Sequence, residues 1–405
     1  MSSVVIELFD EKSIGRNFQL AALASIMSEI PEDLKRRILN GVTTNVIQLS
    51  SEEYATISNA LANFLDIVCA EETKGAKGTR GKPKGKSVPR LYAAGGDEYK
   101  DRKILASAGI IGEGGELTCQ GVKNALKTLP PDKLATPVQV PMFLKTYVFS
   151  YYRHQSKVQN TRVSSLLIAT VGSIISLISK LERKEKEGVQ RTEIYLIPDA
   201  SPPSLELSRK VYNLFYAVRD GEVKKIQDLI NNVAVELGGV SEHQAILLSL
   251  LMYVAQIEEL ANELSADLDA IVEADGFETF LLTRIDASKN RPLLVSATPA
   301  SISWILRRLG EKNSIKLLNT MSWLVSSSVK SENPDFKNTA KSASAKCLNS
   351  FYKYVETGSL DTLVECSRDL VVLADKAGQL QGFNHVREAG AAARKTLYYI
   401  TRILG

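Results

Sequence analysis

The clearest chemical signal in the sequence is a cluster of cations in residues 73–90, TKGAKGTRGKPKGKSVPR. The stretch contains four Gly, two Pro and no acidic residue. Gly and Pro at this density, with almost no apolar residues, predict a solvated loop. Such a loop can neutralise nucleic-acid phosphates and release their counterions. The alternative is a surface loop that only aids solubility. Its cations are Lys74, Lys77, Arg80, Lys82, Lys84, Lys86 and Arg90.

Aromatic residues lie among the cations that follow this loop. Tyr92 precedes Lys100, Arg102 and Lys103. Single-stranded bases stack on aromatic rings while cations track the phosphates, so these residues extend the predicted site. The alternative is that the tyrosine anchors a loop on the core. A second aromatic run, residues 143–152, precedes three further candidate phosphate contacts, namely Arg153, Lys157 and Arg162.

Two further cation pairs lie near the carboxy terminus, where helical spacing dominates. Lys337 and Lys341 are one helical turn apart, and Arg387 and Arg394 are two turns apart. This spacing predicts a basic stripe on the outside of a helical bundle. Trp304 and Trp323 are predicted to lie in its core.

The motifs of enzyme chemistry are not found. The Gly-rich stretch at residues 112–115 is not followed by GK[ST], and no GxSxG motif occurs. Three histidines without nearby Cys or acid clusters predict no zinc site. We therefore predict a binding protein without catalytic residues, metal or cofactor. The alternative from another class is a metal-dependent nuclease that uses Asp199 or the acids of residues 273–278, although no acid-x-Lys pair accompanies Asp199.

Charge is segregated along the chain, whose formal net charge is +4. Residues 74–103 hold ten bases and three acids (+7), and residues 298–405 hold fifteen bases and nine acids (+6). Residues 241–278 hold nine acids and no Lys or Arg. This pattern predicts cationic surfaces for a polyanion and one anionic surface. A third interpretation is an assembly scaffold whose acidic region binds a basic partner.

Composition is that of a soluble globular protein, with 44% hydrophobic and 24% charged residues. The widely spaced cysteines, without a CxxC motif, favour the reduced cytoplasm. The amino terminus predicts no signal peptide. The apolar run 163–178 is short for a membrane span and predicts a buried helix, so no membrane association is expected.

The periodicity predicts an α+β, mainly helical protein. A mixed α/β nucleic-acid-binding region, residues 1–297, carries the basic flexible loop at 73–103. An antiparallel helical bundle, residues 298–405, follows it. Strands are predicted at 4–9, 43–49, 193–198, 280–285 and 292–295. Helices are predicted at 16–30, 32–39, 50–70, 122–129, 163–181, 223–237 and 242–264, and in the bundle at 299–309, 314–330, 334–356, 359–376 and 382–404.

This layout resembles the large subunit of the archaeal type I-A CRISPR interference (Cascade) complex. Two stretches are similar to that family, ILASAGIIGEGGELTCQGVKNAL and IYLIPDASPPS. The resemblance implies a non-enzymatic subunit of an RNA-guided antiviral complex. It would contact the guide RNA 5′ end, help recognise the short motif beside the target DNA and help recruit the helicase–nuclease. Its other partners would be the backbone subunits and the small subunit.

Overall fold

The structure is a computed structural model, and it is an α+β, mainly helical protein. It describes residues 3–11, 13–69, 89, 98–112, 117–141, 143–145, 159–185, 188–198, 229–230, 232–237, 239–256, 279–287, 293–301, 312–380 and 382–405. Among these residues, no helix combines the length and the hydropathy that a membrane crossing requires.

The chain forms two compact units. The first unit comprises residues 1–220 and 277–300, and the bundle unit comprises residues 221–276 and 301–405. This division differs from the predicted boundary at 297/298, because residues 221–276 belong with the bundle. The reason is packing: α11 (Glu242–Gln256) and the π-helical segment η4 (Asn232–Leu237) contact α15 (Lys312–Lys330) and α16 (Pro334–Thr357).

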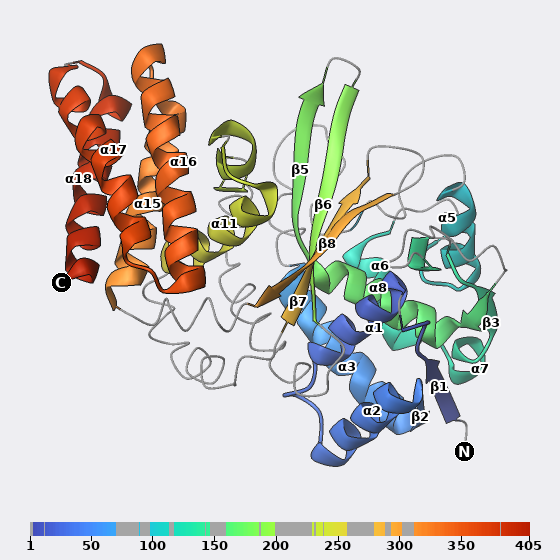
Figure 1. Cartoon of the computed structure of the whole chain (residues 1–405). Coiled ribbons are helices and arrows are strands. Elements are labelled where there is room, and N and C mark those ends of the chain that lie inside the picture. The colour runs from blue at the N-terminus through green and yellow to red at the C-terminus, as the bar shows by residue number, and fades with distance from the viewer. Residues whose placement is uncertain are drawn as a thin grey trace. The chain divides into compact units, whose positions relative to one another are not determined.

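The first unit combines helices with three small antiparallel sheets (Figure 1). Strand β1 pairs with β2, β3 with β4, and the largest sheet has the order β5-β6-β7-β8. Its strands are β1 (Ser3–Glu7), β2 (Val46–Ser50), β3 (Pro137–Gln139), β4 (Asn160–Arg162), β5 (Leu177–Glu185), β6 (Gly188–Pro198), β7 (Thr279–Asp286) and β8 (Leu293–Ser301). Its helices are α1 (Ile14–Ala24), α2 (Glu32–Thr44), α3 (Ser51–Val68), α5 (Glu98–Ser107), α6 (Cys119–Thr128), α7 (Pro131–Leu134) and α8 (Val163–Ser176), with the 3₁₀ turn η2 (Phe143–Lys145).

The core of the first unit is built around the contact between α1 and α8. Every residue of both helices is buried. Gly172 of α8 allows the close approach, because a Cβ at this position would lie 1.7 Å from the Phe18 carbonyl oxygen of α1. Buried polar groups between these elements are bonded: the Gln19 amide accepts from the Phe9 N–H (2.9 Å) and donates to the Ser165 carbonyl (3.2 Å).

Arg16 is a buried cation that ties α1 to the end of α2. Its Nη2 donates to the Val42 carbonyl at 3.0 Å, and its Nη1 donates to the Asn45 side chain. Burial lowers the pKa of Arg16, while the nearby Glu11 and Asp10 raise it. The guanidinium therefore serves as a structural cross-link inside the unit.

Helix α3 begins with a capping box. The Ser50 hydroxyl accepts from the Glu53 N–H (3.2 Å), and the Glu53 carboxylate accepts from the Ser50 N–H (2.7 Å). These bonds satisfy two orphan N–H groups at the helix start. The bond from the Ser50 N–H is the main cause that lowers the pKa of Glu53.

All four cysteines are paired, which corrects the expectation of reduced thiols. Cys69, at the end of α3, bonds to Cys119, at the start of α6. In the bundle unit Cys347 of α16 bonds to Cys366 of α17. Their wide spacing in the sequence concealed this pairing, because helix packing brings each pair together.

Four long helices lie in the described part of the bundle unit, which confirms the predicted antiparallel bundle. These are α15, α16, α17 (Asp361–Gln379) and α18 (Asn384–Leu404). Helix α15 packs on α16 and α18, and α17 packs on the same two helices, so the four form a closed ring of contacts (Figure 1). Asn333 caps α16 through the Phe336 N–H (2.9 Å), and Gly358 ends it in the left-handed region (φ 72°).

The sequence spacing of four and three residues from Val386 through Gly390, Ala393, Leu397 and Ile400 to Leu404 predicts a packing seam on α18, and this seam is buried over most of its length. Val386, Gly390 and Ile400 are buried, whereas Leu404 at the helix end is exposed. A Cβ at Gly390 would lie 2.4 Å from the Ala377 Cβ of α17, so the absence of a side chain sets the close approach.

Several predicted elements are wrong at their boundaries, and three of them are described here. Thr298–Pro299 reads as a helix start but lies within β8, which continues to Ser301. The end of the predicted flexible loop 73–103 is helical from Glu98, where α5 begins. The predicted helix 163–181 ends at Ser176, because Leu177 onward pairs with β6 as strand β5. In each case sheet pairing or burial outweighs the local sequence signal.

Candidate nucleic-acid interface

Most residues of the predicted basic loop lie outside the described residues. So do Asp199, residues 273–278, Trp304 and most of the acidic region 241–278. For Lys100 only the backbone is described, in α5. The predicted binding residues outside the description are Lys74, Lys77, Arg80, Lys82, Lys84, Lys86, Arg90, Tyr92, Arg153 and Lys157.

The structure describes the side chains of three of the predicted binding cations in the first unit, namely Arg102, Lys103 and Arg162. Arg102 is half-buried and Lys103 is exposed, both on α5. Arg162 ends β4, and its Nε pairs with the Glu7 carboxylate of β1 at 3.0 Å. This ion pair gives Arg162 a structural partner in place of the predicted phosphate.

The two predicted lysines of α16 have different environments. Lys341 pairs with Glu236 of η4 at 3.5 Å, and its side chain is 21% exposed. Lys337, one turn earlier, is half-buried. The predicted basic stripe is therefore interrupted on α16, because part of its charge is used to hold η4.

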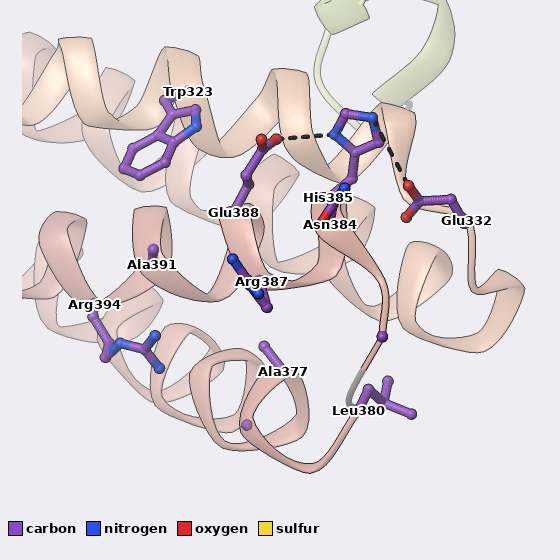
Figure 2. A pocket seen from close by; sticks show the side chains of 12 residues that line it. Trp323, Glu332, Ala377, Leu380, Asn384, His385, Arg387, Glu388, Ala391 and Arg394 are labelled. Carbon is purple, nitrogen blue, oxygen red and sulfur yellow. Dashed lines mark hydrogen bonds and ion pairs between the residues drawn. The ribbon is translucent and has the colours of Figure 1, made fainter.

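Arg387 and Arg394 are both exposed on the outer face of α18, as predicted. Both line a cleft of about 880 Å³ that also includes residues of α15 and α17. Figure 2 shows the two arginines on the side of α18 toward Ala377, and Trp323 on the side of α15. Within the described part of the chain, neither arginine forms an ion pair.

Trp323 corrects the prediction of a buried core residue. It is 39% exposed and lines both the large cleft and an adjoining hollow of about 390 Å³. The second hollow brings Trp323 together with Lys316 of α15 and with Lys395 and Tyr399 of α18. The site therefore has an indole at its centre and cations on two helices around it.

Two acidic residues, Glu332 and Glu388, are among the described residues that line the large cleft. His385 lies between Glu388, whose Oε2 is 2.9 Å from Nδ1, and Glu332, whose Oε1 is 3.9 Å from Nε2 (Figure 2). The two carboxylates thus share one imidazole. Lys316 and Lys395, next to Trp323, have no ion pair among the described residues.

The carboxy-terminal turn repeats the combination of cation and ring. The Arg402 guanidinium lies 5.3 Å from the centre of the Tyr398 ring, and its Nε donates to the Tyr398 hydroxyl at 3.2 Å. Tyr398 itself is 51% exposed. The outer face of α18 therefore presents cations toward both ends of the helix and an exposed aromatic ring near its carboxy-terminal end.

This surface, which we call the α15–α18 face, can bind a polyanion and stack a planar group. Its members are Lys316, Trp323, Arg387, Arg394, Lys395, Tyr398, Tyr399 and Arg402. Cations without acidic partners can neutralise phosphates, and an exposed indole can stack a base. Among the described residues, no group of three or more His, Cys, Asp or Glu is placed to hold a metal ion.

Sequence reasoning missed Lys316, Lys395 and the exposure of Trp323, although a signal was present. The buried residues of α15 include Leu317, Met321 and Leu324, at helical spacing. Trp323 lies off that spacing and falls seven residues after Lys316, which places the two on one outward face.

Comparison with known proteins adds no relative to this picture. No protein-family model matches the chain, and no curated protein matches it in sequence.

Proposed function

We propose that this protein is a nucleic-acid-binding subunit that acts without catalysis in an RNA-guided DNA interference complex. The observation that carries nucleic-acid binding is the exposed Trp323 among cations of the α15–α18 face that have no ion pair with any described residue. The assignment to a complex, as its large subunit, rests on the resemblance of the sequence layout to that of the type I-A family. Guide RNA, target DNA and the other interference subunits are the partners that the proposal implies.

Binding on this face would depend mainly on the phosphate backbone. Lys316 and Lys395 flank the indole, so a strand could place a base against Trp323 and its phosphates near both amines. Arg387 and Arg394 would extend the phosphate path along α18. Stacking tolerates any base, so this face would supply affinity and leave sequence reading to base pairing elsewhere.

Substitution of the face tests this proposal. In the full chain, Lys316→Ala, Arg394→Ala and Lys395→Ala together should weaken binding of labelled single strands. Each lost phosphate contact should flatten the slope of log affinity against log salt by about 0.7. A matched control, Lys346→Ala with Lys353→Ala and Arg368→Ala, removes the same charge from α16 and α17. Equal loss in both variants would contradict a site on this face.

Stacking is tested separately from charge. Trp323→Ala should cost about 1–3 kcal/mol of binding free energy for a stacked base, and Trp323→Phe should recover part of the loss. Fluorescence anisotropy measures both affinities. Unchanged affinity in Trp323→Ala would exclude stacking on the indole.

The role in a complex has its own test. Affinity purification of the tagged chain from its native host should retain a guide RNA, backbone and small subunits and the helicase–nuclease. Recovery of the chain free of RNA and of these proteins would contradict the assignment. Labelled DNA and RNA incubated with the pure chain and Mg²⁺ or Mn²⁺ should stay intact, and cleavage lost in Asp199→Ala would make the protein a nuclease.

A further inference from the structure

The first unit contains a small cleft that the proposed function does not use. Its volume is about 190 Å³, and its lining comes from α3, from α6 and α7, and from β1. The cleft is therefore large enough for one ring and too small for a whole cofactor. Its apolar lining residues are Val4, Ala55, Leu126, Leu129, Pro131 and Leu134.

Two buried hydroxyl groups belong to the same cleft, one helical turn apart on α3. Tyr54 is 4% exposed and Ser58 is 3% exposed. By strict distance and angle, neither the Tyr54 hydroxyl nor the Ser58 Oγ forms a hydrogen bond within the described structure, although Ser58 is close enough to lower the pKa of Tyr54 by hydrogen bonding. Even if the two hydroxyls bond to each other, one donor and several acceptor positions stay unused in the cleft, and buried polar groups nearly always use theirs.

The protonation of Tyr54 suits it to donate a hydrogen bond. Burial raises the pKa of Tyr54 well above its ordinary value, and the neighbouring Ser58 hydroxyl lowers it by less. The phenol is therefore neutral at physiological pH. A neutral hydroxyl can donate and accept, as the Ser58 hydroxyl can.

The charged and amide groups of the cleft lie at its mouth. Lys127 of α6 and Asn59 of α3 line the cleft and are exposed, whereas Val4 and Leu134 are buried. None of the described residues that line the buried end is a cation, so a negative charge would have no partner among them. A ligand would therefore present an uncharged polar edge to the hydroxyls, an apolar body to the walls and an anionic group to Lys127.

We propose that this cleft binds a nucleoside monophosphate, with the base against Tyr54 and Ser58 and the phosphate beside Lys127. A nucleobase has the required uncharged donor and acceptor edge and apolar faces. The ribose and phosphate stay outside, because the cleft holds only one ring system. Since both hydroxyls donate and accept, the site accepts any of the four bases with little discrimination. This site is in the first unit, so it is independent of the α15–α18 face.

Saturation-transfer NMR with the full chain tests the proposal, with AMP, CMP, GMP and UMP as probes. We expect saturable binding with a Kd on the order of 1 mM, as suits a contact of one ring. Base protons should receive more saturation than ribose protons. The corresponding nucleosides should bind more weakly, because they lack the phosphate.

Two substitutions locate the site. Tyr54→Phe removes one hydroxyl while keeping the ring, and it should weaken binding about fivefold. Lys127→Ala should abolish the advantage of nucleotide over nucleoside, whereas the matched control Lys35→Ala, which removes a lysine of α2 outside the cleft, should not. Thermal unfolding curves that match wild type confirm that each variant is folded. If no nucleotide binds, or if Tyr54→Phe binds as wild type does, water alone fills the cleft and the proposal is wrong.

Discussion

Three cations of the first unit and the arginines on the α15–α18 face of the bundle unit differ in their partners. In the first unit Arg16 is buried and bonded to a carbonyl, Arg162 pairs with Glu7, and Lys123 pairs with Asp66. On the α15–α18 face of the bundle unit, the described residues provide no ion pair for Arg387 or Arg394.

This difference shows that the number of cations says less about a surface than their pairing does. An Arg that donates to a carbonyl and an amide has little capacity left for a phosphate, and its removal affects folding. A cation without an acidic neighbour contributes little to folding and can release counterions on binding. Within the described residues, the bundle unit is therefore the better candidate for a polyanion site.

The largest expected effect compares the two disulfides, one in each unit. In the chain-entropy model, loss of Cys69–Cys119, with a separation of 50 residues, should cost about 4 kcal/mol of unfolding free energy. Loss of Cys347–Cys366, with a separation of 19, should cost about 3 kcal/mol. Denaturant unfolding of the paired Cys→Ala variants measures both. Four free thiols in the native oxidised protein would show that neither bond forms.

A smaller effect on the free energy of unfolding is expected when substitution of Arg16 is compared with substitution of Arg394. Arg16→Met should lose about 3 kcal/mol of unfolding free energy, because the Val42 carbonyl and the Asn45 side chain lose their donor. Arg394→Met should change stability by less than about 0.5 kcal/mol, because the side chain is exposed.

For nucleic-acid binding the order should be reversed, with the larger effect in Arg394→Met and the smaller in Arg16→Met. Arg394→Met should reduce the salt slope, and folded Arg16→Met should keep the wild-type slope. Equal destabilisation by the two substitutions would remove the contrast between the units.

The smallest effect concerns the capping box of α3. Ser50→Ala should cost about 1 kcal/mol at neutral pH, because the Glu53 N–H loses its acceptor. The folded-state pKa of Glu53 is lowered, so its stabilisation is present above its ordinary value of 4.5 and is lost as pH falls through the folded-state value.

Glu53→Gln should therefore lose less stability than wild type on acidification below pH 4.5. Unfolding curves from pH 5 to about 2 measure this dependence. Glu52→Gln is the matched control, since Glu52 is exposed in the same turn. Identical acid profiles of wild type and Glu53→Gln would remove the assigned role.

The bundle helices were predictable from sequence because their signals are local. Asn333–Pro334 and Gly358 mark the ends of α16, and the seam spacing of α18 identifies its buried face. The continuation of β8 through Thr298–Pro299 was not predicted, because Thr-Pro is also a typical helix start, even though the partner strand β7 lies only six residues earlier in the chain. The cysteine pairs were hidden because their partners are 50 and 19 residues apart and are brought together by helix packing.

The candidate site was predictable only in part. Arg387 and Arg394 follow from helical spacing on one helix. Their combination with Trp323 depends on the packing of α15 beside α18, which no local pattern encodes. A Trp in an apolar helix also reads as core, unless its phase relative to Leu317 and Met321 is examined.

Gly390 bears on the geometry of the cleft as well as on packing. It lies one turn before Arg394 and sets the distance between α18 and Ala377 of α17, which lines the same cleft. A methyl group at position 390 would push α18, and with it Arg387 and Arg394, away from α17. The width of the cleft therefore depends on residue 390, which is not among the described residues that line it.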